Sequence, residues 1–240
     1  MKSSNKLVYG ELGRFPLYIK SAARCVKYWF RLQKLAPSRY ARKAYDMLYF
    51  QDTRGRVNWV SKVKNLLCMN GFGYVWMYGE VGNEKLFLKA FQSKLQDIFC
   101  QGWLSDLARS THFGLYGTFK SCLEREKYID LLDKDNFRKA YARFRCGVSE
   151  INCHRYRFSQ LASSRICPFC PGCPENEEHV VFICHAYDEL RQKYVRVDSS
   201  ALNYIHLVRM LSSGNEDTIR YFATFIFLVL EKRRILIGQP

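Results

Sequence analysis

The sequence has no apolar segment long enough to cross a bilayer. Its longest apolar run, YFATFIFLVL at 221–230, has half of the about 20 residues that a membrane-spanning helix needs. The first residues, MKSSNKLVYGELGRFP, also lack the apolar core of a signal peptide. We therefore expect no membrane partner, and we expect residues 221–230 to form a buried helix.

The sequence also lacks the paired cysteine pattern of a secreted, disulfide-linked protein. Six of its ten cysteines stand alone in helical or aromatic surroundings, and the other four lie between residues 167 and 184. A reducing compartment suits such cysteines. We therefore expect an intracellular protein, in the cytoplasm, the nucleus or both.

Acidic residues are scarce relative to basic ones. The 240 residues include 22 Asp and Glu against 38 Lys and Arg, so the formal net charge is +16. Residues 1–66 contain fifteen basic and three acidic residues and thus most of the excess. Such a charge is typical of proteins that bind a polyanion, most often a nucleic acid, so RNA or DNA is the expected partner.

Strict alternation of apolar and polar residues, which would indicate strands, is almost absent. Apolar residues recur at helical spacing instead, so the expected fold is mainly α: an irregular multi-helix assembly with a small zinc-binding module of Cys-Cys-His-Cys type. Residues 71–83, rich in glycine and aromatics, favour a short strand or an ordered loop. Helices are expected at 17–35, from an N-cap at Ser38 through 48, and at 58–69, 84–102, 113–123, 135–146, 186–195, 200–212 and 216–235.

Domain boundaries are weakly indicated. Helical periodicity is lost at 147–166, which predicts a basic helical region at 1–146 and a zinc-binding module, with the segment before it, at 147–195. The helices of 196–240 are expected to pack on the rest.

Two basic segments are candidates for nucleic-acid contact. The first is the outer face of the helix at 17–35, with Lys20, Arg24, Lys27 and Arg31. The second interleaves basic and aromatic residues, which suits phosphate contact and base stacking. Alternatively, its arginine stems cover a half-buried helix while aromatics fill the core. Its candidate residues are Arg138, Lys139, Arg143, Arg145, Arg155, Tyr156 and Arg157.

The stretch CPFCPGCPENEEHVVFICH at 167–185 has the residue types of a zinc site. A Cys-x2-Cys pair lets one turn present two thiolates to the same ion. The predicted ligands of Zn2+ are Cys167, Cys170, His179 and Cys184. Since His179 and Cys184 are five residues apart, both can face one ion only if a helix there is distorted or ends between them.

Two alternatives remain open within this stretch. Cys173 can replace Cys170, and His185 can replace Cys184. Four protein ligands close the zinc shell, which favours a structural role over catalysis. The segment 167–190 has five acidic residues and no Lys or Arg, so we expect it to repel phosphates rather than bind them.

The residues of this region resemble a known family. FRCGVSEINCHRYRF, CPFC and ENEEHVVFICHAYDELRQKY are similar in order to the C-terminal tail of animal non-LTR (LINE-type) retrotransposon polyproteins, which contains a reverse-transcriptase zinc-binding region. LVYGELGRFPLYIKSAARCVKYWFRL resembles the helical segment after the polymerase part. The similarity extends from about residue 7 to 235. The matching residues are Phe144, Arg145, Gly147, Ser149, Cys167, Pro168, Cys170, Glu177, Glu178, His179, Cys184, Tyr187, Leu190 and Arg191.

The resemblance implies a zinc-binding region that helps an upstream polymerase hold RNA or target DNA. The chain departs from an intact element, because it has no Asp-Asp pair for the two metal ions of nucleotidyl transfer and no counterpart of the endonuclease region. We therefore expect no polymerase or endonuclease activity, no small-molecule substrate, and a zinc-stabilised nucleic-acid-binding module. The alternative is a zinc-stabilised helical domain that docks onto a polymerase or another protein.

Overall fold

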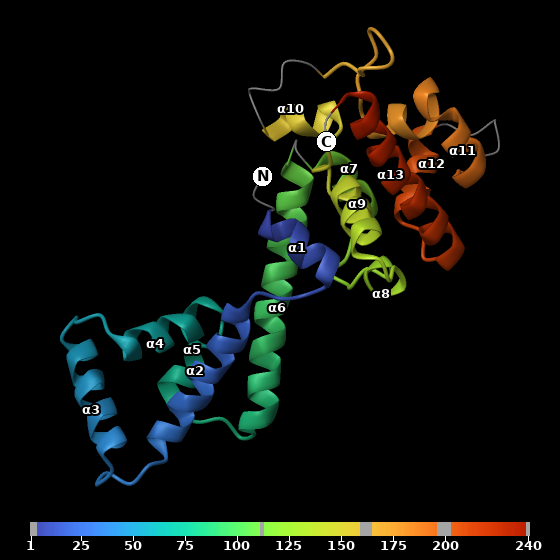
Figure 1. Ribbon diagram of the computed structural model, residues 1–240. Coiled ribbons are helices and arrows are strands. Elements are labelled where there is room, and N and C mark those ends of the chain that lie inside the picture. The colour runs from blue at the N-terminus through green and yellow to red at the C-terminus, as the bar shows by residue number, and fades with distance from the viewer. Residues whose placement is uncertain (1–3, 111–112, 159–164, 196–202, 239–240) are drawn as a thin grey trace. The chain divides into compact units, whose positions relative to one another are not determined.

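The fold is all-α. The computed structural model describes residues 4–110, 113–158, 165–195 and 203–238 (Figure 1). The structure is 71% helical, and its extended pairings within the described ranges are two isolated bridges, Leu12 with Arg125 and Ile166 with Pro174. The predicted fold class is confirmed. None of the described helices has the length and apolar character needed to cross a membrane.

The chain divides into two compact units that differ from the predicted domains. One unit combines residues 1–14 with 103–240, and the other comprises residues 15–102. The boundaries at 146/147 and 195/196 are therefore wrong. Helices on both sides of them share one core, in which Phe144 lies with Cys184 and Phe222.

The unit of residues 15–102 forms around one amphipathic helix. Its buried side chains recur every three or four residues, and they pack against aromatic residues of the later helices, as Phe30 does against Phe87. Truncating one such buried aromatic costs about 3–5 kcal/mol. The helices are α2 (Leu17–Gln33), α3 (Tyr40–Thr53), α4 (Trp59–Met69), α5 (Gly73–Tyr78) and the first part of α6 (Glu84–Arg109).

Helix starts in this unit follow the sequence only in part. Asn58 caps α4, because its side chain accepts a hydrogen bond from Val60 N while Ser61 Oγ accepts one from Asn58 N. The predicted N-cap at Ser38 is wrong. The helix begins at Tyr40, and the capping position belongs to Arg39, whose side chain makes no capping hydrogen bond.

Two further predictions for this part of the chain are wrong. Residues 73–78, expected as a strand or loop, form α5, because Val75 is buried against neighbouring helices. The break expected near Gly102 does not occur, and α6 continues to Arg109. A glycine costs a helix about 1 kcal/mol, and the burial of Leu95, Trp103 and Leu107 on either side offsets that cost.

The larger unit has a core that surrounds one long helix. This helix, α13 (Glu216–Leu236), buries most of the apolar run, including Phe222, Phe225 and Val229, which confirms the predicted buried helix. It packs on α9 and α11. The other helices are α1 (Asn5–Leu12), α7 (Gly114–Phe119), α8 (Tyr128–Leu131), α9 (Asp135–Arg145), α10 (Asn152–Phe158), α11 (Asp188–Tyr194) and α12 (Asn203–Leu211).

Between α10 and α11 the chain forms two short helical turns. A π-helical turn, η1, covers His179–Ile183, and a 3-10 turn, η2, covers His185–Tyr187. The loss of periodicity predicted for 147–166 is wrong for residues 152–158, because α10 forms there. Asn152 at its start donates its backbone N–H to Glu175, and α10 is thereby held against the segment that precedes η1.

Candidate metal centre and basic surfaces

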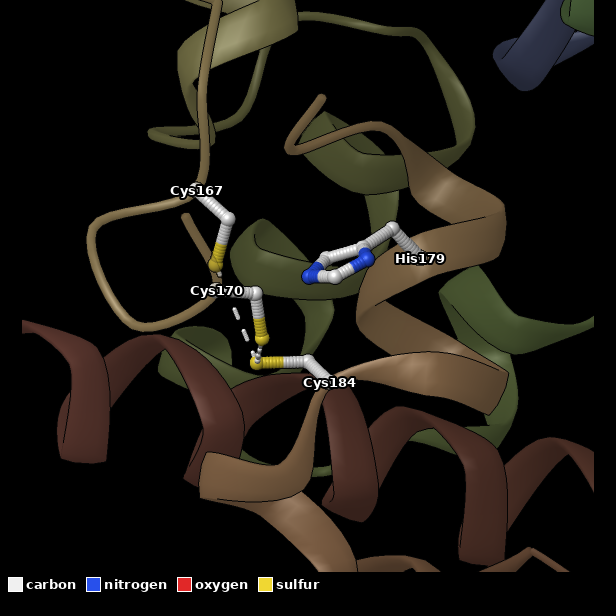
Figure 2. Close-up of side chains that lie close together, drawn as sticks. All are labelled: Cys167, Cys170, His179 and Cys184. Atoms are coloured by element: carbon white, nitrogen blue, oxygen red, sulfur yellow. Dashed lines mark hydrogen bonds between the residues drawn. The ribbon is translucent and has the colours of Figure 1, made fainter. Parts of the chain in front are cut away.

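Four side chains from two short segments converge in the larger unit. Figure 2 shows the three sulfurs and the imidazole of His179 facing a common point. The ligand atoms of Cys167, Cys170, His179 and Cys184 all lie within 4.8 Å of one another. This cluster can hold a metal ion, and it is the set that the sequence predicts.

The sulfur separations suit one tetrahedral ion. Cys184 Sγ lies 3.8 Å from Cys167 Sγ and 3.7 Å from Cys170 Sγ. Thiolates bound to zinc at about 2.3 Å in a tetrahedron are about 3.8 Å apart. Both separations from Cys184 Sγ therefore already match the spacing in a bound ion's ligand shell.

A tight loop places the first two cysteines. Cys167 N donates to Cys173 O at 2.8 Å, and Cys173 N donates to Cys170 O at 3.2 Å. Phe169 N lies 3.5 Å from Cys167 Sγ and donates to it, as backbone amides do to thiolates. Gly172 has a φ of 79°, a left-handed conformation that a side chain would strain. The loop thus presents both thiols toward one side.

The π-helical turn places the other two ligands. In an α-helix, residues five apart lie about 140° apart around the axis. The wider turn at 179–183 instead joins Cys184 N to His179 O by a hydrogen bond of 2.8 Å. This i to i+5 bond brings both side chains to the same side of the turn. The distortion that the sequence predicts between these ligands is therefore confirmed.

One buried atom of the cluster has an unsatisfied bonding capacity. His179 is 3% exposed, and its Nε2 has no hydrogen-bond partner among the residues that the structure describes. A buried polar atom without a partner costs about 1–3 kcal/mol. A cation coordinated by Nε2 removes that cost, so the imidazole fits a metal site better than an empty pocket.

Burial also acts on the protonation of the ligands. It raises the pKa of the Cys167 and Cys184 thiols above the ordinary value, and it lowers the pKa of the His179 imidazole. Without a cation, the site favours neutral thiols and a neutral imidazole. A bound cation stabilises the thiolates and displaces their protons, so metal binding and proton release are coupled.

The geometry distinguishes the two pairs of alternative ligands. The four-atom cluster contains Cys170 rather than Cys173 and Cys184 rather than His185. His185 is exposed, and its Nδ1 lies 3.2 Å from Cys170 Sγ. His185 can therefore donate a hydrogen bond to a ligand sulfur from outside the cluster.

The acidic residues around the cluster are less exposed than their sequence suggests. Glu175 is fully buried and forms an ion pair with Arg233 of α13, and Glu177 is 5% exposed and lies 2.7 Å from His154 Nε2. The expected repulsion of phosphates by all five acids is therefore an overestimate. Asp188 and Glu189 are the exposed acids among them.

A buried hydrogen-bonded chain, which the sequence did not reveal, lies next to the metal cluster. Ser149 Oγ is 2.7 Å from His154 Nδ1, and His154 Nε2 is 2.7 Å from Glu177 Oε1. Ser149 N also donates to Nδ1, which assigns the ring proton to Nε2 in the neutral tautomer. The three residue types match a hydrolytic triad. However, Ser149 is only 3% exposed, and the side chains of His154 and Glu177 are 0% and 7% exposed. Their burial leaves no access for a substrate. We therefore interpret these hydrogen bonds as structural, because they connect the α9–α10 loop to the segment that contains the metal ligands.

Arg145 does not belong to the nucleic-acid surface that the sequence predicts. Its side chain is 2% exposed, and it forms ion pairs with Glu11 and Glu126 and donates to Leu211 O. Aromatic rings surround the guanidinium, among them that of Tyr141. This prediction is wrong because an arginine at the end of α9 points into the core, where Glu11 of α1 compensates its charge.

The other candidates in this segment differ in exposure. Arg138 and Arg157 are half-buried; Arg138 pairs with Asp135, and Arg157 lies 3.6 Å from Glu177. Tyr141 and Phe144 lie in the core, as the alternative interpretation of this segment expects. The exposed candidates are Lys139, Arg143, Arg155 and Tyr156.

The basic residues of α2 form a second surface, in the unit of residues 15–102. Lys20, Arg24, Lys27 and Arg31 are all exposed, opposite the buried face of the helix. Among the described residues, none of the four forms an ion pair with an acid. Their charges are therefore available to an external partner.

No protein-family model, curated protein or solved structure matches this chain. Fold and site define the protein as an all-α chain with a buried Cys3His cluster that can hold a metal ion.

Proposed function

We propose that this protein is a zinc-stabilised nucleic-acid-binding module without polymerase or endonuclease activity of its own. The observation that supports it most is that a large excess of positive charge lies in one unit of the chain and the metal cluster in the other. Residues 15–102 contain fifteen Lys and Arg against five Asp and Glu, a net charge of +10, whereas the cluster is buried in the other unit. Exposed positive charge of this density attracts polyanions.

Zinc is the proposed metal. Three thiols and one imidazole suit a structural zinc ion, because soft thiolate ligands select against Mg2+ and Ca2+ and four ligands complete a tetrahedron. The role of the ion is to hold the loop at 167–173 against the π-helical turn. The hydrogen bonds from Arg191 to Val181 O and Cys184 O, both 2.7 Å, support the turn from the other side.

We further propose that the module derives from the C-terminal region of a retrotransposon reverse transcriptase. In support, several residues that match the family pattern have local roles around the cluster. Ser149 and Glu177 belong to the buried chain through His154, Tyr187 is fully buried, and Arg191 supports the π-helical turn. A parent polymerase region is then a further expected partner.

The alternative function, a protein-docking domain without nucleic-acid binding, has less support. It relies on the apolar C-terminal helix as the docking element. The central residues of α13 are already buried in the chain's own core, and the exposed large apolar side chains of this helix, Tyr221, Ile235 and Leu236, lie toward its two ends.

The proposal is tested by metal analysis and by a salt titration of binding. The purified protein is expected to contain one zinc per chain and to bind RNA and DNA with an affinity whose logarithm falls linearly with the logarithm of salt concentration. Replacing exposed Arg143 and Arg155 by alanine is expected to weaken binding with the fold intact. Absence of binding at low salt, or binding that does not change with salt, contradicts the proposal.

A further inference from the structure

A groove lies between α2 and α6 within the unit of residues 15–102. Its volume is about 650 Å³. Among the described residues, no acidic and no aromatic side chain lines it. Its polar lining includes Lys20, Arg24 and Lys27 of α2 and Lys89, Gln92 and Gln96 of α6.

One polar face of α2 and one polar face of α6 form this groove, and the two faces have similar residue spacing. On α2 the lining residues recur at positions 20, 24 and 27, and on α6 at positions 89, 92 and 96, the spacing that places side chains on one side of a helix. The neighbouring apolar faces pack together, with Phe30 against Phe87 at a ring distance of 5.7 Å. The polar faces therefore remain side by side at the edge of this contact.

The two helices run in opposite directions along the groove. Lys34, after the end of α2, pairs with Glu84 at the start of α6, and Phe15, before α2, packs on Phe99. Glu84 is thus already engaged at one end. The Lys34–Glu84 ion pair joins the two helices outside the groove, and the cations of the groove have no acidic partner among the described residues.

The charges in the groove repel one another. Four cations, Lys20, Arg24, Lys27 and Lys89, line one surface, and the amides of Gln92 and Gln96 add hydrogen-bond donors between them. An anion with several oxygens relieves this repulsion and accepts those hydrogen bonds. Lys20 and Lys27 are about 10 Å apart along the helix, which corresponds to about three nucleotide steps of B-form DNA.

We propose that this groove binds the phosphodiester backbone of a nucleic acid, and that Lys89, Gln92 and Gln96 are contact residues together with the α2 cations. The inference rests on the proposed nucleic-acid function and assigns it a site. The groove has no aromatic residue for base stacking, so it contacts the backbone and binds without sequence preference. The site belongs to a different unit from the metal cluster.

The test compares two variants of equal charge. Arg24→Gln/Lys89→Gln removes two cations from the groove, and Lys62→Gln/Lys94→Gln removes two exposed cations of the same unit that lie outside it. A third variant, Gln92→Glu, adds a negative charge inside the groove with almost no change of shape. Each full-length protein is titrated with a 20-base-pair DNA duplex and a 20-nucleotide RNA at several salt concentrations. Circular dichroism verifies that each variant keeps its helicity.

The groove pair and Gln92→Glu are expected to lower affinity at least about tenfold, and the control pair less than about threefold. For the groove pair, the slope of log affinity against log salt falls by about 0.9 per lost contact with duplex, or about 0.7 with single strands. Equal losses in both pairs overturn the groove site while leaving nucleic-acid binding by the protein intact. No binding by the wild type refutes the proposed function itself. Each protein is also titrated with phosphatidylserine vesicles, and tighter, groove-dependent binding to these vesicles than to nucleic acid also overturns the proposal.

Discussion

Arg233 and Glu175 form an ion pair in which both side chains are buried. Arg233 Nε lies 2.7 Å from Glu175 Oε1, and Arg233 Nη2 lies 2.9 Å from Oε2. Asn152 joins the pair, since its backbone N–H donates to Glu175 and its side-chain oxygen accepts from Arg233. One contact thus connects α13, α10 and the segment that leads into the metal ligands.

Breaking this pair is expected to destabilise the protein strongly. Glu175→Gln leaves the Arg233 charge buried without compensation, which costs about 3–5 kcal/mol of unfolding free energy. Glu189→Gln is the matched control, because Glu189 is exposed and its contact with Lys232 is 3.8 Å long. Urea denaturation measures both changes. A loss below about 1 kcal/mol for Glu175→Gln means that the pair is not structurally important.

Loss of the metal is expected to unfold the region around its ligands. Cys170→Ser should reduce zinc content below one equivalent and lower the unfolding free energy by more than about 3 kcal/mol, because metal binding to such sites contributes about 10 kcal/mol or more to folding. Cys173→Ser is the matched control and should retain zinc, since Cys173 lies outside the four-atom cluster. Metal analysis and thermal melts with and without a chelator measure the effect. Unchanged helicity and melting temperature after chelation contradict a structural metal.

Two neighbouring arginines of α9 are expected to have different roles. Arg145→Ala leaves buried Glu11 without the charge that compensates it and should cost about 3–5 kcal/mol of stability. Arg143→Ala removes an exposed charge and should change stability by less than about 0.5 kcal/mol while weakening nucleic-acid binding. Denaturation and binding titrations separate the two roles. Equal stability losses would place Arg143 in the core as well.

Stability is expected to depend on pH through Glu150. Two hydrogen bonds from Arg234, each 2.8 Å long, hold the pKa of this carboxyl below its ordinary value, although partial burial opposes the shift. A lowered pKa in the folded state means that the contribution is fully present above pH 4.5 and is lost as pH falls through the lowered value. Because the pair is partly exposed, it contributes less than about 1 kcal/mol. The stability difference between wild type and Glu150→Gln should therefore shrink between pH 6 and pH 3, and a difference that stays constant contradicts this.

The sequence predicts local features of this protein well. Helical periodicity indicates α2 and α13, and the spacing of Cys167, Cys170, His179 and Cys184 selects the four atoms that converge. These features depend on residues close together in the chain. Even the distortion between His179 and Cys184 follows from counting residues per turn.

Features that depend on distant residues are not visible in the sequence. Arg145 is of the same residue type as exposed Arg143, two positions earlier, and its burial depends on contacts with distant residues, among them Glu11, over a hundred residues earlier. Gly102 suggests a break that packing by Trp103 overrides. The contribution of Lys89 to the α2–α6 groove likewise depends on which helix lies beside α2.

Helix α1 belongs to the same compact unit as residues 103–240. The residues of the other unit, 15–102, therefore lie in the sequence between α1 and the rest of the unit to which α1 belongs. During synthesis, residues 15–102 can fold as soon as they leave the ribosome. Glu11 can form its ion pair with Arg145, and accept the 2.6 Å hydrogen bond from the Tyr128 hydroxyl, only after those later residues have been synthesised. The first helix of the chain is thus among the last to reach its final contacts. Until Arg145 and Tyr128 have been synthesised, the buried side of α1, including Leu7, therefore lacks part of the core that covers it in the folded protein.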